Sequence, residues 1–136
     1  MNATVKLAAF INQRNCMPFQ WGKNDCCLLV ADWVRFATGQ DVAADFRGKY
    51  RSENGAFKQL FKRGLNDVQS VFKDRLNREI PIAYARRGDC ALVQFNGELV
   101  GGIVTVNAVV CVGENGLVTK PMSFVKAVYP LEPRNV

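Results

Sequence analysis

The chain has 136 residues, of which 49% are hydrophobic and 22% are charged. These values are typical of one globular domain that buries a core of its own. The apolar cluster near the N-terminus is too short to cross a membrane and has no cleavage site, so we expect no signal peptide, no membrane contact and synthesis in a cytoplasm. Without repeats or linkers, residues 1–136 are predicted to form one domain.

The net charge is +6, and the chain contains no histidine. Basic side chains that are clustered can bind phosphates, but here they are spread over predicted helices without a nucleic-acid-binding motif. We therefore favour a solvated helical surface and keep a nucleic-acid contact as a lesser alternative. The basic residues concerned are Lys58, Lys62, Arg63, Lys73, Arg75, Arg78, Arg86 and Arg87.

Five cysteines form an odd set without a C-x-x-C pair: Cys16, Cys26, Cys27, Cys90 and Cys111. Their spacing does not fit a zinc site, and imidazole ligands are absent. We expect reduced thiols, with those of Cys90 and Cys111 buried in apolar strands, and neither a metal nor another cofactor. An iron–sulfur cluster is the weaker alternative.

The first half of the chain has helical periodicity. We predict helices over residues 4–14 and from Cys26 to residue 38, the second capped by Asn24 or Asp25 and ended by Gly39. Residues 15–24 and 40–51 are predicted to be loops, and the polar residues of the second loop are typical of a site.

Two shorter helices are predicted before Pro81. The first covers residues 55–63, with a cap at Ser52 and with four side chains facing inward: Ala56, Phe57, Leu60 and Phe61. The second begins with a capping box formed by Asn66 and Gln69.

After Gly88 the hydrophobic pattern changes to that of strands joined by tight turns. Asn96-Gly97 is a strong hairpin signal. The predicted strands are residues 90–95, 99–106, 109–112 and 117–119, and residues 124–129 are a closing strand or a short helix entering one. Helices followed by an antiparallel meander indicate the α+β class.

The central motif is the loop and helix around Cys26. A thiol in the first turn of a helix is stabilised as the thiolate by the helix dipole and by unpaired backbone N–H groups. Acyl transfer also needs a base, for which histidine is the usual residue. Because the chain has no histidine, it cannot form a Cys–His dyad by itself.

Several motifs resemble the NlpC-type, papain-like cysteine peptidases, which act on peptidoglycan stem peptides. The resemblance covers residues 17–129 and is closest to a phage-encoded branch of unknown function. It rests on Pro18-Phe19, Trp21-Gly22, Asp25-Cys26, Ala31-Asp32, Thr38-Gly39, Arg47-Gly48, Tyr50, Gly55-Ala56 and Arg86-Arg87-Gly88-Asp89. It implies a papain-like fold in which a helix carrying the cysteine packs on an antiparallel sheet.

The resemblance implies roles for individual residues. Cys26 takes the nucleophile position, and Asp25 shapes the loop before it. The family's histidine precedes a Val-Gly-Ile-like run, and that alignment places Val100 at the histidine position. The third polar residue of the family falls near Glu114.

We therefore expect a catalytically degenerate NlpC-type domain that is a structural component of a phage tail tip or baseplate in the virion. Its expected partners are hub, central-fibre or tape-measure proteins, contacted through aromatic anchors at Phe19, Trp21 and Tyr50. The alternative is an active cysteine hydrolase of peptidoglycan in which the base is a carboxylate, from Asp89, Asp45 or Glu114, with a pKa raised by burial.

Overall fold

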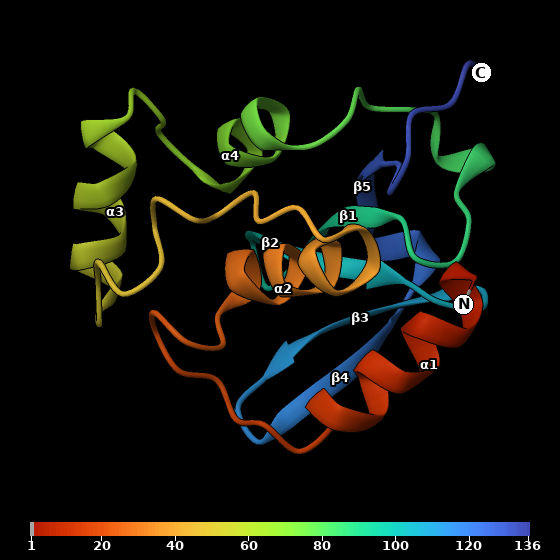
Figure 1. Cartoon of the computed structure of the whole chain (residues 1–136), viewed down its shortest axis with the longest axis horizontal. Helices are drawn as coiled ribbons and strands as arrows, with labels where there is room; N and C mark the ends of the chain where they lie inside the picture. Colours follow the sequence, from red (N-terminus) through yellow and green to blue (C-terminus); the bar gives the residue numbers. More distant parts are fainter. Residues whose placement is uncertain (1) are drawn as a thin grey trace.

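The computed structural model describes residues 2–136 and has an α+β architecture, which confirms the predicted fold class (Figure 1). Among these residues, four α-helices precede the strands. They are α1 (Ala3–Arg14), α2 (Cys26–Thr38), α3 (Glu53–Lys62) and α4 (Val68–Arg75).

Five strands form one antiparallel sheet with the order β4-β3-β2-β1-β5. The strands are β1 (Cys90–Phe95), β2 (Glu98–Val104), β3 (Ala108–Gly113), β4 (Gly116–Pro121) and β5 (Val125–Tyr129). Short 3₁₀ turns cover Ile82–Tyr84 and Met122–Phe124, so the last apolar run of the sequence enters its strand through a helical turn.

The helix ends follow the capping chemistry of the sequence. Asp25 caps α2 by accepting a hydrogen bond from the N–H of Leu28, and Ser52 caps α3 in the same way. Gly39 ends α2 in the left-handed conformation, with φ at 84°. The predicted capping box of the fourth helix is wrong by one residue, because Asp67 and Ser70 form the reciprocal pair instead of Asn66 and Gln69.

The strand boundaries are set by tight turns. Asn96 and Gly97 both have positive φ, as the hairpin signal predicts, and join β1 to β2. Strand β2 ends at Val104, two residues before the predicted end, because Asn107 also has a positive φ and the chain turns there into β3. The N–H of Thr105 donates to the carbonyl of Ala108 and closes this turn.

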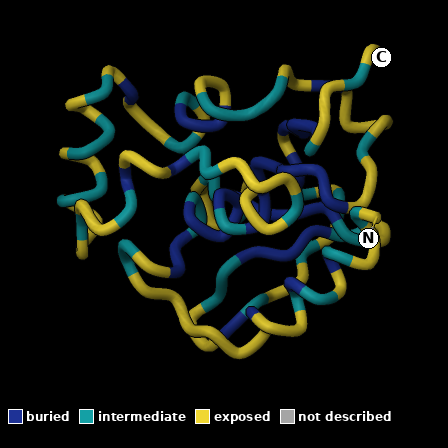
Figure 2. Tube along the Cα trace, in the orientation of Figure 1, coloured by how far each residue is buried: buried dark blue, intermediate teal, exposed yellow. Residues whose placement is uncertain are grey.

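The helices cover one face of the sheet. Figure 1 shows α2 in front of the strands, with α1 and α4 on either side of it. The core between these layers is built around Trp33, whose indole N–H donates to the carbonyl of Gly88 at 2.7 Å. Its buried members include Leu29, Val30, Phe72, Leu92, Ile103 and Tyr129. Figure 2 shows that buried residues are concentrated in α2 and the central strands.

The opposite face of the sheet carries a second apolar cluster. Its buried members include Ala91, Val93, Val104, Cys111 and Val128. Cys90 belongs to the first face and Cys111 to the second, so the burial predicted for both thiols is confirmed. All five cysteines are unbridged.

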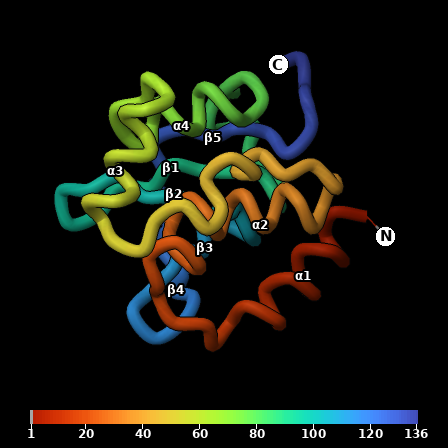
Figure 3. The backbone as a smooth tube through the Cα atoms, turned by 60° about the vertical axis from the view of Figure 1, so that its left-hand side comes forward, coloured from red at the N-terminus to blue at the C-terminus, as the bar shows by residue number. Residues whose placement is uncertain are grey.

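Helix α3 lies at the edge of the molecule, beyond α2 and beside α4 (Figures 1 and 3). None of its residues is buried, and the exposed fractions of Phe57 and Phe61 are 43% and 65%. The prediction that Phe61 faces inward is therefore wrong, whereas Phe57 is turned partly toward the protein and partly toward solvent. Ala56 and Leu60 face the protein, whereas residues one position further along lie about 100° round the helix.

No helix in residues 2–136 is long and apolar enough to cross a membrane.

Candidate functional site

Cys26 is the first residue of α2 and is half-buried, which confirms the predicted position of this thiol at a helix N-terminus. The Asp25 carboxylate before it is 1% exposed. One carboxylate oxygen accepts from the N–H of Leu28 at 3.0 Å and thereby caps the helix. The other accepts from the N–H of Gly22 at 3.0 Å and from the Tyr50 hydroxyl at 2.5 Å.

Asp25 therefore holds together the two loops that flank the site. Burial and the nearby carboxylate raise the pKa of the Tyr50 hydroxyl, so this group remains a proton donor. A second contact between the loops involves Gly22, which has φ at 80°. A Cβ at this position would lie 2.1 Å from the Tyr50 carbonyl oxygen, so only glycine fits.

Strand β2 passes directly behind the start of α2. The residue that faces Cys26 is Gly101, where a Cβ would lie 2.6 Å from the Cys26 carbonyl oxygen. Val100 packs with the cluster on the opposite face of the sheet. Val100, which the resemblance places at the family's histidine position, therefore does not face Cys26, because neighbouring residues of a strand point to opposite faces. Leu99 shares the face of Gly101.

The surroundings of Cys26 favour its thiolate. A hydrogen bond from the adjacent Cys27 thiol lowers the pKa of Cys26, and the N–H groups of Gly101 and Cys27 act in the same direction. Burial and the Asp25 charge oppose this effect. The pKa of Cys27 is raised well above its usual value by its role as donor and by burial. Cys26 is thus the thiol of the pair that ionises first.

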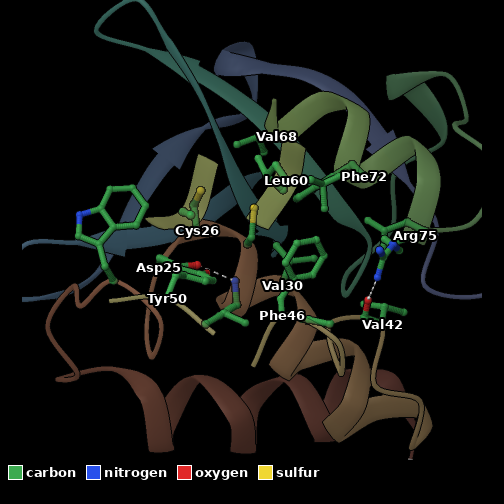
Figure 4. A pocket seen from close by; sticks show the side chains of 18 of the residues that line it. Asp25, Cys26, Val30, Val42, Phe46, Tyr50, Leu60, Val68, Phe72 and Arg75 are labelled. Atoms are coloured by element: carbon green, nitrogen blue, oxygen red, sulfur yellow. Dashed lines mark hydrogen bonds between the residues drawn. The ribbon is translucent and has the colours of Figure 1, made fainter. Parts of the chain in front are cut away.

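A cavity of about 110 Å³ adjoins the two cysteines (Figure 4). Cys26 and Asp25 lie on one side of it, and Val42 and Arg75 lie on the other. The lining comes from α2, the loop of residues 40–51, α3 and α4, and it is almost entirely apolar. Val68, Phe72 and Leu76 are spaced four residues apart and therefore lie on one side of α4 and its C-terminal cap. Their approach to Cys26 depends on the loop between α2 and α3.

Residues 2–131 match the family described as "Domain of unknown function (DUF6950)". The chain belongs to this family. The match extends from α1 to β5 and includes the Cys26 site and the cavity beside it. No curated protein matches the chain.

The three carboxylates considered as bases occupy different places in this DUF6950 domain. Asp89 is buried at the start of the sheet, where it accepts from the N–H groups of Arg86 and Leu131 and pairs with Arg134. Glu114 is exposed in the turn between β3 and β4.

Asp45 binds Arg63 and Arg75, each at 2.7 Å. The hydrogen bond from Arg75, with a further one from Arg63, holds the pKa of Asp45 well below its usual range. This shift is opposite to the one that a carboxylate base for a thiol requires. Both guanidinium groups also lie over the Phe46 ring, at 4.5 and 4.9 Å from its centroid. Asp45 and Phe46 therefore fasten the loop of residues 40–51 to α3 and α4.

The aromatic residues predicted to bind partners differ in accessibility. Phe19 is 37% exposed and packs edge-on against Trp21, with ring centroids 4.9 Å apart. Trp21 is half-buried and also lines the cavity. Tyr50 points inward, since its hydroxyl binds Asp25. Phe57 and Phe61, which the helical pattern predicts to face inward, are both exposed on α3, although Phe57 also lines the cavity.

Two of the basic residues considered for phosphate contacts, Arg63 and Arg75, are already paired with Asp45 in this DUF6950 domain. Within residues 2–136, no group of three or more Cys, Asp or Glu side chains is arranged to hold a metal ion.

Proposed function

We propose that this DUF6950 domain has a papain-like, NlpC-type fold and is a structural component of a phage tail tip or baseplate, without peptidase turnover. Its proposed partners are hub, central-fibre or tape-measure proteins. The resemblance described above motivates the location. The α+β architecture, with a cysteine at the start of a helix that packs on an antiparallel sheet, is consistent with the proposed fold.

One observation carries the loss of turnover. The sheet position that faces Cys26 is Gly101, and the chain has no histidine. The nearest carboxylate, Asp25, accepts three hydrogen bonds and caps α2. A thiolate can form and attack, but hydrolysis of an amide also requires a group that protonates the leaving amine and activates water. Gly101 provides no such group, and the Asp25 carboxylate is already used for the helix cap, Gly22 and Tyr50.

Exposed aromatic side chains provide a surface for protein partners. Phe19 and Trp21 form a pair on the loop before α2, and Phe57 and Phe61 lie on α3. Aromatic side chains are enriched among the residues that dominate binding energies. A stable interface at these positions would bury about 800 Å² on this domain.

Mass spectrometry of purified particles of the phage whose genome encodes the chain tests the location. We expect the protein in mature tails, and tail assembly should fail or slow in a deletion strain. Normal tails that lack the protein would contradict the proposal. In assembled particles, replacement of Phe19 and Trp21 by alanine should reduce incorporation, whereas Thr119→Ala on β4 should not.

A cysteine hydrolase of peptidoglycan is the second candidate, and the lowered pKa of Cys26 favours it. Incubation of the purified protein with peptidoglycan, followed by separation of released muropeptides, distinguishes the two functions. Turnover that disappears in Cys26→Ala would establish the hydrolase. We expect no turnover.

A further inference from the structure

The cavity beside Cys26 is suited to a hydrocarbon chain. Its walls are apolar side chains from α2, the loop of residues 40–51, α3 and α4, among them Val30, Phe46, Ala56, Leu60, Val68 and Phe72. Most of these side chains are buried or half-buried, and they converge on a space next to two thiols (Figure 4). Burial of apolar surface is the main binding energy that such walls can provide.

The polar groups of the lining are already used within the protein. Asp25 binds two backbone N–H groups and Tyr50, while the guanidinium of Arg75 binds Asp45 and Asp74. Only the two thiols and the indole N–H of Trp21 remain. A peptide segment entering the cavity would give up hydrogen bonds to water without replacing them. A saturated chain has no such bonds to lose.

The size of the cavity limits the length of the chain. An engineered apolar cavity of about 150 Å³ binds benzene. The cavity here, at about 110 Å³, by the same ratio holds roughly four or five carbon atoms, to which the carbonyl carbon at the sulfur adds one. Because Cys26 lies at its side and is half-exposed, the carbonyl end of such a chain would meet the sulfur while the rest of the donor stays in solvent.

We propose that this cavity binds a saturated acyl chain of about six carbons and that Cys26 takes the acyl group from a thioester donor. The Cys26 sulfur, after loss of its proton to solvent, attacks the thioester carbonyl. A new carbon–sulfur bond to Cys26 forms, the carbon–sulfur bond of the donor breaks, and the donor leaves as a thiolate that takes a proton from water. No oxidant or reductant is needed.

The acyl group is expected to remain on Cys26. Deacylation by water needs a base that faces the thioester, and Gly101 occupies the sheet position opposite the cysteine. The lowered pKa of Cys26 supports the first step but does not help the second. This activity goes beyond the proposed tail role, because it uses only the site of the isolated domain.

The test uses S-hexanoyl-N-acetylcysteamine as the donor, with the S-acetyl compound for comparison. Intact-mass spectrometry should show one hexanoyl group per chain, located on Cys26 by peptide mapping and removed by hydroxylamine. Each buried methylene is worth roughly a factor of four in binding. The acylation rate at low donor concentration should therefore be on the order of 100-fold higher for hexanoyl than for acetyl.

Variants separate the cavity from general thiol reactivity. Ala56→Phe and Val68→Phe, which fill the cavity from two different helices, should slow hexanoylation at least about tenfold and leave acetylation unchanged. Asn54→Ala, on α3 but outside the lining, is the control and should react like the unmodified protein. Cys26→Ser should give no adduct, whereas Cys16→Ser should give the full adduct.

Equal rates for the two donors, or labelling of Cys16 as fast as Cys26, would overturn the proposal. Rapid turnover of the hexanoyl donor at Cys26, with the same chain-length preference, would support the cavity and contradict the absence of hydrolysis in the proposed function. Absence of the protein from virions would contradict the tail role and leave the acylation result unaffected.

Discussion

Gly101 and Cys26 are in such close contact that a single added carbon at Gly101 would lie 2.6 Å from the Cys26 carbonyl oxygen. It would also lie 2.8 Å from the Phe72 ring. The contact lies where β2 has separated from β3, since these strands pair only at Ile103 and Val104. The start of α2 packs against Gly101 in this part of β2, and this contact places Cys26 against the sheet.

We predict that Gly101→Ala lowers the free energy of unfolding by about 2 kcal/mol, because the backbone of α2 must move to admit the methyl group. Urea titration followed by circular dichroism measures the change. Thr119→Ala, at an exposed position of β4, serves as the control and should change the value by less than about 0.5 kcal/mol. An unchanged urea midpoint for Gly101→Ala would show that α2 and β2 are not in the close contact described here.

A histidine introduced into β2 should affect Cys26 only from the face that Gly101 shares. We expect Leu99→His to change the pH dependence of Cys26 alkylation by iodoacetamide, because the imidazole titrates near pH 6.5 and would lie on the Cys26 side of the sheet. Val100→His is the matched variant, and its ring should lie among the residues of the opposite cluster. A larger effect from Val100→His would reverse the assignment of the two faces.

The adjacent thiol should control the ionisation of Cys26. Cys27→Ala removes the hydrogen bond that lowers the pKa of Cys26, so this pKa should rise. A net hydrogen bond is worth about 1 kcal/mol, so alkylation near pH 7 should slow roughly fivefold. The alkylation rates of the unmodified protein and of Cys27→Ala should converge at pH values where Cys26 is ionised in both proteins. Cys27→Ser, which keeps a donor, should retain most of the rate; a loss as large as that of alanine would point to packing instead.

Asp25 should influence both stability and reactivity. Asp25→Asn keeps an acceptor for the cap but removes the charge that raises the pKa of Cys26, so alkylation near pH 7 should become faster. It also weakens the bonds from Gly22 and Tyr50, with an expected loss of about 2 kcal/mol in unfolding free energy. Tyr50→Phe removes only the hydroxyl that donates to Asp25 and should lower the free energy of unfolding by about 1 kcal/mol. Slower alkylation in Asp25→Asn would contradict the electrostatic role.

The pairing of Asp45 should make stability depend on pH. The pKa of Asp45 is lower in the folded protein than in the unfolded chain. The ion pairs therefore stabilise the folded state at pH values above the pKa of the unfolded chain, and this stabilisation is lost as the pH falls toward the pKa of the folded protein. Asp45→Asn should lower the unfolding free energy by about 1 kcal/mol near neutral pH, since this carboxylate is partly exposed. The difference from the unmodified protein should shrink below about pH 4. A difference that persists at low pH would assign the effect to packing.

Local chemistry in the sequence was sufficient to predict much of the fold. The apolar periodicity after Cys26, with Asp25 before it and Gly39 after it, predicted α2 because capping and periodicity depend on residues close in sequence. The same holds for the Asn96-Gly97 hairpin and for the burial of Cys90 and Cys111. The place of Cys26 at the start of a helix and the absence of histidine also follow directly from the sequence.

Only the tertiary structure determined which distant residues meet. The face of β2 that touches Cys26 depends on a register that a shift of one residue reverses, and the structure places Gly101, not Val100, on that face. The inward turn of Tyr50 requires a carboxylate 25 positions earlier in the chain. The exposure of Phe57 and Phe61 depends on how far α3 lies from the sheet, which helical periodicity does not contain. The cavity beside Cys26 has the same origin, because its walls come from the loop before α2, from α2, from the loop of residues 40–51, from α3 and from α4, which only folding brings together.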